Sequence, residues 1–221
     1  MTLEPPGSIA VVGAGPLGIE AALYGRFLGY DVQLIEAVSV GQSMQTQRDE
    51  PLPMLPNRCL SPLALSALQA QSHEGPPFAL PTTIGKWIDE ALLALTETDL
   101  LSGRLCCPAR VTQIDHLPVE PNDDDSIRDE PDSDNMVSPD FRLTIADGEP
   151  IDAESVILAV GPSNDIKFGF DVPTPYLFRI GESISETAEE HLLLGLKQIV
   201  DIYATLADRE SLDLYRPRRG V

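Results

Sequence analysis

The residues best suited to chemistry form a glycine-rich stretch at positions 13–18, Gly-Ala-Gly-Pro-Leu-Gly. An apolar run at 9–12 precedes it, and a helix-like run at 19–28 follows it. Strand, glycine turn and helix is the context in which G-x-G-x-x-G binds a dinucleotide. Gly13 would permit the tight turn, Gly15 would let a pyrophosphate approach the backbone, and Gly18 would let the helix pack on the strand. The helix N-terminus would then offer free N–H groups and a partial positive charge to the phosphates.

An acidic residue stands where a bound nucleotide would need an acceptor. Residues 31–35 read as a second strand, and Glu36 follows it, 23 residues after Gly13. A carboxylate there can accept hydrogen bonds from the 2′- and 3′-hydroxyls of an adenosine ribose. The alternative is a structural glycine turn beside a surface glutamate. We predict a dinucleotide site that includes Gly13, Ala14, Gly15, Pro16, Leu17, Gly18 and Glu36.

The rest of the chain alternates between strand-like and helix-like segments. Strands are expected at 110–114, 141–145, 155–160 and 176–180, and helices at 60–71, 82–95 and 186–207, the last capped by Ser183 and Glu186. The turn Asp147-Gly148 after residues 141–145 indicates a hairpin. We predict a single α/β domain over residues 1–221: a Rossmann-like, FAD/NAD(P)-binding, three-layer fold with a central parallel sheet and a small antiparallel β hairpin or meander.

Three of the expected strands end in glycine, at Gly13, Gly161 and Gly181. In an open α/β sheet, ligands bind beyond the carboxyl ends of the strands. Three such corners can surround one long cofactor, which favours FAD over NAD.

These motifs, in this order, resemble the FAD-binding domain of the flavoprotein oxidoreductase superfamily that includes thioredoxin reductase and the flavin-containing monooxygenases. The resemblance implies that the first motif holds the FAD pyrophosphate and that Glu36 holds the ribose. It implies that the turn around Gln42 lies along the cofactor and that the strand at Val111 meets the adenine. The segment ending Ala159-Val160-Gly161 is similar to the family's A-T-G motif, and Gly181-Glu182 is similar to its G-D motif, whose acid contacts the ribityl chain.

The chain also departs from that family. A nicotinamide-binding domain normally follows the second motif, but here only about fifteen residues separate Gly161 from Tyr176. No second glycine fingerprint occurs, and the redox cysteine pair is missing. We therefore expect the flavin to be reduced directly by a substrate or by a redox partner, and a homo-oligomer is compatible with this arrangement. A non-catalytic FAD-binding scaffold or sensor and an NAD(H)-binding oxidoreductase remain alternatives.

Composition limits the partners and the compartment. The net charge of −20 argues against nucleic acid. Residues 119–140 carry nine acids and one base, so we expect a flexible acidic loop there and a frayed tail at 209–221. No apolar run is long enough to span a membrane, and no signal peptide is evident. Three cysteines without a pairing pattern favour the cytoplasm, and no metal site is expected.

No catalytic residue emerges from the sequence. We expect His73 and His116 on the surface and His191 in a structural or exposed position on the last helix. Arg48 could pair with phosphate or lie on the surface. Two further residues, Cys59 and Trp87, are expected in the core.

Overall fold

A computed structural model describes residues 2–71, 79–117, 141–161, 165–183 and 185–216. Its centre is a five-stranded sheet in which every pairing is parallel. The strand order is β3 (Leu105–Cys106), β2 (Asp31–Ile35), β1 (Ser8–Val12), β7 (Ser155–Leu158) and β9 (Leu177–Arg179). The central strands β1 and β7 are almost wholly buried, as parallel strands covered on both faces must be. This confirms the predicted α/β class with its central parallel sheet.

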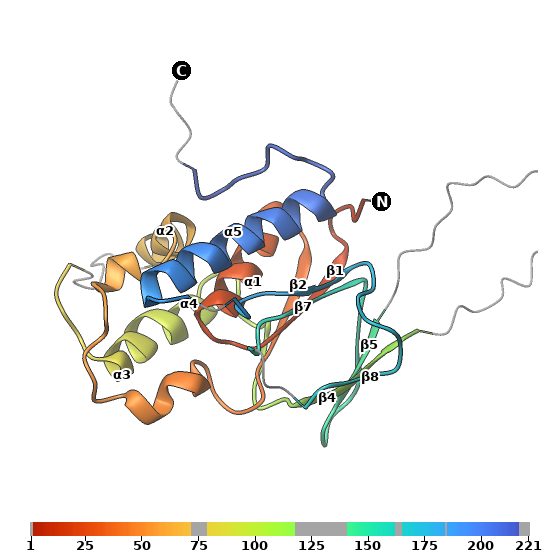
Figure 1. Cartoon of the computed structure of the whole chain (residues 1–221), viewed down its shortest axis with the longest axis horizontal. Coiled ribbons are helices and arrows are strands. Elements are labelled where there is room, and N and C mark those ends of the chain that lie inside the picture. The colour runs from red at the N-terminus through yellow and green to blue at the C-terminus, as the bar shows by residue number, and fades with distance from the viewer. Residues whose placement is uncertain (1, 72–78, 118–140, 162–164, 184, 217–221) are drawn as a thin grey trace, which may run out of the picture.

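Helices cover the sheet and close one end of it (Figure 1). Helix α1 (Pro16–Leu28) packs against α5 (Ala188–Leu206), and the Tyr203 hydroxyl donates to the Ala21 carbonyl across 2.8 Å. Helix α2 (Pro62–Gln71) lies beside α1. The expected helix at 82–95 is a continuous helical segment of α3 (Ile84–Trp87), the π-helical turn η3 (Ile88–Leu92) and α4 (Leu93–Thr96). Two 3₁₀ helices, η1 (Gln42–Gln47) and η2 (Pro56–Arg58), lie in the long connection after β2.

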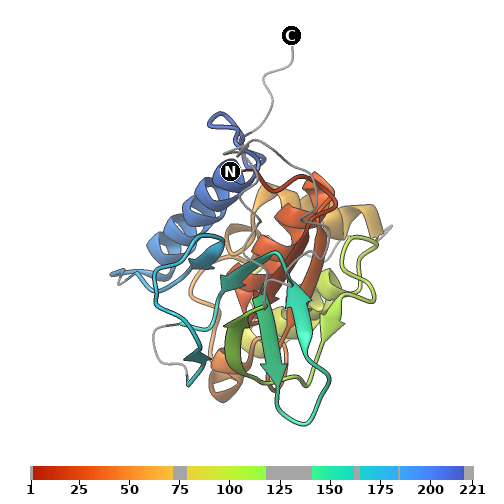
Figure 2. The same cartoon turned by 90° about the vertical axis from the view of Figure 1, so that its right-hand side faces the viewer.

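A second sheet lies on the opposite side of the molecule from α5 (Figures 1 and 2). Its strand order is β6 (Ile151–Ala153), β5 (Phe141–Ile145), β4 (Val111–His116) and β8 (Lys167–Phe168). The first three strands form the antiparallel meander that the sequence predicts. Strand β8 was not predicted and joins β4 in parallel, so the sheet is mixed rather than purely antiparallel. Its two-residue length leaves no hydrophobic pattern to detect.

Helix α5 begins later than the sequence predicts. Thr187, and not Ser183, is the N-cap: its hydroxyl accepts from the Glu190 amide at 3.1 Å. Glu190 in turn accepts from the Glu186 amide at 3.2 Å. The capping pattern of a hydroxyl followed three residues later by glutamate is thus present, but at Thr187 and Glu190, four residues after the predicted position.

The segment after α5 differs from the frayed tail expected at 209–221. Within its described part, Leu212, Leu214 and Tyr215 pack against the core. The Tyr215 ring lies edge-on to Tyr24 with centroids 5.1 Å apart, and the Tyr24 hydroxyl accepts from the Leu214 amide at 3.0 Å. Aromatic packing therefore fixes the described part of this segment against the core, although its sequence is largely polar and charged. Residues 217–221 lie outside the described part.

Other expectations fall partly or wholly outside the described residues. The acidic segment expected at 119–140 and His73 both lie there. Among the helices in the described ranges, none combines the length and the apolar character that a membrane crossing requires.

Candidate functional site

A cavity of about 780 Å³ opens at the carboxyl ends of β1, β7 and β9. Its wall is completed by η1, α3 and the start of α5. This volume falls within the range of small-molecule sites. Parallel strands place their carboxyl ends at one edge, so the three glycine corners that are far apart in sequence meet here. Gly13, Gly161 and Gly181 all line the cavity.

The three glycines of the first motif differ in what surrounds them. Gly13 has φ +105°, and a Cβ there would lie 2.6 Å from the Ala159 carbonyl oxygen. At Gly18 a Cβ would lie 1.8 Å from the Gly13 carbonyl oxygen, so α1 packs directly on the turn. At Gly15 a Cβ would meet no atom within 4 Å, and the residue lines the cavity. Close packing thus accounts for glycine at 13 and 18. At 15 no protein atom would clash with a side chain, and the space that a side chain would fill belongs to the cavity.

Helix α1 begins at this same point. Gly15 is its N-cap, no side chain caps the helix, and no acidic residue occupies its first turn. The first amides of a helix have no intrahelical acceptor and carry a partial positive charge. An anion in the cavity would meet these amides directly.

Glu36 is 92% buried and is held by the glycine turn. One carboxylate oxygen accepts from the Ala14 amide at 2.8 Å and the other from the Val38 amide at 3.0 Å. Its own backbone is fixed by β3 and by the segment after it, since the Glu36 amide donates to the Cys106 carbonyl and the Ala109 amide donates to the Glu36 carbonyl. The carboxylate therefore lines the cavity in a fixed position, and its remaining lone pairs can accept from a ligand.

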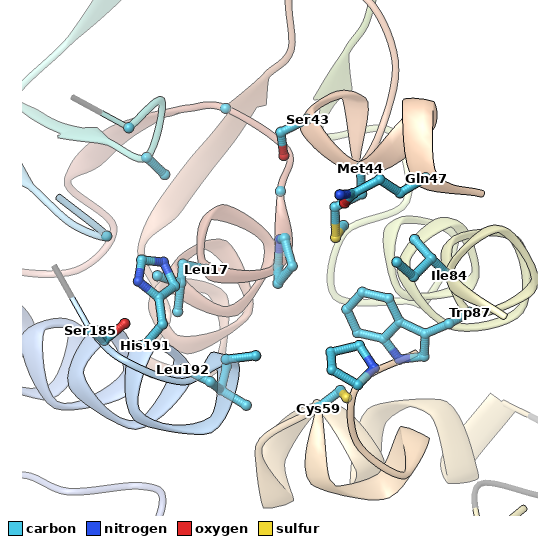
Figure 3. A pocket seen from close by; sticks show the side chains of 18 of the residues that line it. Leu17, Ser43, Met44, Gln47, Cys59, Ile84, Trp87, Ser185, His191 and Leu192 are labelled. Carbon is cyan, nitrogen blue, oxygen red and sulfur yellow. The ribbon is translucent and has the colours of Figure 1, made fainter. Parts of the chain in front are cut away.

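Two walls of side chains face each other across the cavity (Figure 3). One wall carries Leu17 from α1 and His191 and Leu192 from α5. The facing wall carries Met44 from η1, with Trp87 from α3. Gln47, Cys59 and Ile84 lie on or beside this second wall, and Met54 is a further lining residue. The predominance of aliphatic, thioether and indole groups would favour a flat, largely apolar group between the walls.

Two residues expected in the core, Trp87 and Cys59, are buried but also line the cavity. Trp87 is 96% buried, as expected for the core, but it also lines the cavity, and its indole N–H has no acceptor among the described residues. Cys59 is buried as well, and burial raises the pKa of its thiol to about 11. The thiol therefore stays protonated near neutral pH and is a poor nucleophile.

The cavity contains few charged side chains. Of the described residues that line it, Glu36 and Glu186 are acidic, His191 can become cationic, and none is lysine or arginine. Arg48, for which a phosphate contact was considered, lies outside the lining residues and pairs with Asp89 at 2.5 Å. Phosphate charge would therefore meet backbone amides rather than a guanidinium.

Most of the predicted site residues meet at this cavity. Those that line it are Gly13, Gly15, Pro16, Leu17, Glu36, Gln42, Ala159, Gly161 and Gly181. Ala14 and Gly18 do not line it but support the turn, through the Ala14 amide and the close approach of Gly18. The expectation of a ribityl contact by Glu182 is not supported, because Glu182 lies outside the lining residues and pairs with Arg179 at 3.0 Å.

Val111 also lies outside the lining residues, buried in β4 opposite Ile145, because that strand belongs to the second sheet. His116 packs on Phe170 in the same region, and His191 lines the cavity instead of serving only the structure of α5. Sequence reasoning missed Met44 and His191 because neither belongs to a spaced motif.

Comparison with known proteins finds similar solved structures but no match among family models or curated proteins. An oxidised steroid monooxygenase bound to NADP is 17% identical over 70% of this chain and 26% of its own, with a TM-score of 0.49. OTEMO in complex with FAD and NADP is 18% identical over 72% and 26%, with a TM-score of 0.45. The bacillithiol disulfide reductase Bdr (YpdA) from Staphylococcus aureus is 16% identical over 82% and 47%, with a TM-score of 0.43. The chain thus spans about a quarter of the steroid monooxygenase and of OTEMO, and about half of the reductase.

Proposed function

We propose that the cavity binds FAD and that the chain is a flavoprotein oxidoreductase. Gly15 carries the proposal: the protein leaves space for a side chain there, yet the residue has none, and an uncapped helix N-terminus opens at the same point. A pyrophosphate that approaches the backbone explains both observations. Three glycine corners around one cavity of about 780 Å³ favour a long dinucleotide.

In this proposal, each part of the chain has a separate task. The Gly15 amide and the amides of the first turn of α1 bind the pyrophosphate, whereas the Gly13 and Ala14 amides already donate to Ile35 and Glu36. Glu36 accepts from the adenosine ribose. The apolar walls that carry Leu17 and Trp87 exclude water from the ring system. When bound, FAD would supply hydride or electron transfer at flavin N5. The protein's contribution is then orientation and exclusion of solvent.

We further propose that the electrons come from a substrate or from a partner. Only about fifteen residues connect Gly161 to Tyr176, and they leave no room for a nicotinamide-binding domain at that point. A second copy of the chain in a homo-oligomer, or a separate redox protein, could supply the electrons that a nicotinamide-binding domain would otherwise deliver. Three free cysteines fit a reducing compartment such as the cytoplasm.

The first experiment is an FAD titration of the purified full chain, followed by flavin absorbance near about 450 nm and by quenching of flavin fluorescence. Gly15→Leu should abolish binding because its side chain would occupy the pyrophosphate position, and Gly15→Ala should weaken it less. Circular dichroism would verify that both variants fold. Tight NADH binding with no FAD uptake would instead support the NAD(H) alternative. Bound flavin that no donor reduces would support a scaffold.

A second variant tests the role of Glu36. Glu36→Gln retains one acceptor oxygen for the turn amides but replaces the other with a donor, so we expect FAD affinity to fall by about tenfold to a hundredfold, the effect of one or two lost charged hydrogen bonds. Asp89→Asn is the matched control, because that carboxylate pairs with Arg48 outside the cavity. Equal FAD affinity for Glu36→Gln and the parent chain would show that Glu36 only supports the turn.

A further inference from the structure

His191 stands at the corner where β9 turns toward α5. Its backbone amide donates to the Thr187 carbonyl at 3.0 Å, which fixes the residue in the first turns of α5. Its ring faces Gly181, where a Cβ would lie 3.7 Å from the imidazole Nε2. Figure 3 shows the ring beside Leu17 on one wall, across the cavity from Trp87. The imidazole therefore borders the space between the two apolar walls.

His191 is also the one described side chain lining the cavity that can carry a positive charge. The nearby guanidinium groups are committed elsewhere: Arg58 pairs with Glu189 and Arg179 pairs with Glu182. The acids of this helix start are Glu186, Glu189 and Glu190. No hydrogen bond joins the imidazole to another described residue, so within the described structure its ring nitrogens are available to a ligand.

We propose that His191 binds the ring system of the flavin and stabilises its reduced, anionic form. This inference rests on the proposed FAD site. Reduction adds two electrons and one proton to the oxidised ring, and the resulting hydroquinone carries one negative charge. A protonated imidazole beside the ring would attract that charge in a largely apolar space. The phosphates have the amides of α1 as partners, so the histidine is left for the ring.

The test compares the two-electron reduction potential of bound FAD in the full chain and in His191→Gln, measured by dithionite titration with a reference dye. We expect binding of reduced FAD to weaken about tenfold relative to oxidised FAD, which corresponds to a potential lower by about 30 mV. His191→Lys places a cation at the same position and should stay near the parent value. Lys197→Gln removes a cation from the exposed side of the same helix and is the matched control.

Binding of ADP, which lacks the flavin ring, separates the ring from the phosphates as the group that His191 contacts. We expect the ADP dissociation constant to be the same for His191→Gln and the parent chain. Equal reduction potentials in these two proteins, or a loss of ADP affinity as large as the loss of FAD affinity, would overturn the inference. If the parent chain binds ADP but no FAD, the proposed function itself fails, and the assignment of His191 fails with it.

Discussion

Two buried carboxylates show how the same residue type serves different ends. Glu36 receives two backbone amides and borders the cavity, where it can still accept from a ligand. Glu20 lies inside the fold on α1 and accepts from the Ser61 amide at 2.7 Å and from the Ser61 hydroxyl at 2.6 Å. Burial raises the pKa of Glu20 to about 7, although these hydrogen bonds favour its charged form. The first carboxylate borders the cavity, whereas the second joins α1 to the start of α2.

The raised pKa of Glu20 predicts a pH-dependent stability. The unfolded chain ionises this group near 4.5 and the folded chain near 7, so the unfolded state binds fewer protons between these values. The free energy of unfolding should therefore fall by about 3 kcal/mol from pH 4.5 to above 7 through this group alone. Glu20→Gln cannot ionise and should lack this component.

Urea denaturation of the parent chain and Glu20→Gln at several pH values from 4.5 to 8.5 would measure the effect. The difference between the two proteins isolates Glu20 from the many other acids. A difference that stays constant with pH would show that Glu20 ionises alike in the folded and unfolded chains.

Between elements, the decisive contact is that of α1 with the turn after β1. This contact sets the direction in which the helix N-terminus points, and Gly18 makes it possible by lying against the Gly13 carbonyl. A side chain at Gly18 would push the helix away from β1 and from the cavity. The motif thus contains a position that packs against backbone and a position that borders the cavity, only three residues apart.

Alanine substitution should separate these two positions. Gly18→Ala places a methyl group 1.8 Å from a backbone oxygen and should cost about 3 kcal/mol of stability or more. Gly15→Ala adds the same methyl group in open space and should cost less than about 1 kcal/mol. Thermal and urea unfolding without FAD would compare them. Similar losses at both positions would contradict the separate roles.

Across the whole molecule, the segment after α5 closes over the contact between α1 and α5. Tyr215 packs on Tyr24, which in turn stacks on Tyr203 with centroids 5.0 Å apart. Tyr203 donates to α1, so three aromatic rings connect the C-terminal segment with the helix that opens the candidate site. The stability of that helix should therefore depend on residues remote from the cavity.

Removal of the Tyr215 ring tests this dependence. Tyr215→Ala should cost about 2 kcal/mol, less than a fully buried aromatic residue because its ring is only partly buried. Arg216→Ala changes the exposed neighbour and should be nearly neutral. Calorimetry of both variants would give the comparison. An unchanged melting temperature for Tyr215→Ala would indicate that the segment contributes little to folding.

Local patterns in the sequence were sufficient to predict which glycine-rich segments line the candidate site. The motif at 13–18, Glu36 and the glycine corners at 161 and 181 meet at one cavity because parallel strands bring their carboxyl ends to one edge. Short strands could not be predicted from the sequence, because two residues, as in β3 and β8, are too few to show a periodic hydrophobic pattern. Thr187 and Ser183 are both followed three residues later by glutamate, so the local pattern alone does not decide which of them caps α5.

The sequence by itself determined the α/β class, the order of the main elements and the turn that would face a pyrophosphate, because these depend on residues adjacent along the chain. Only the tertiary structure decided the facing walls. Met44, Trp87 and His191 come from three separate elements, and nothing in their local sequence relates one to another. The tertiary structure also placed Glu182 and Val111 outside the cavity. It showed that, of the three glycines in the motif, Gly15 is the one at which a Cβ would meet no protein atom. A side chain's role depends on which distant groups the packed core brings near it, and a linear pattern does not contain those distances.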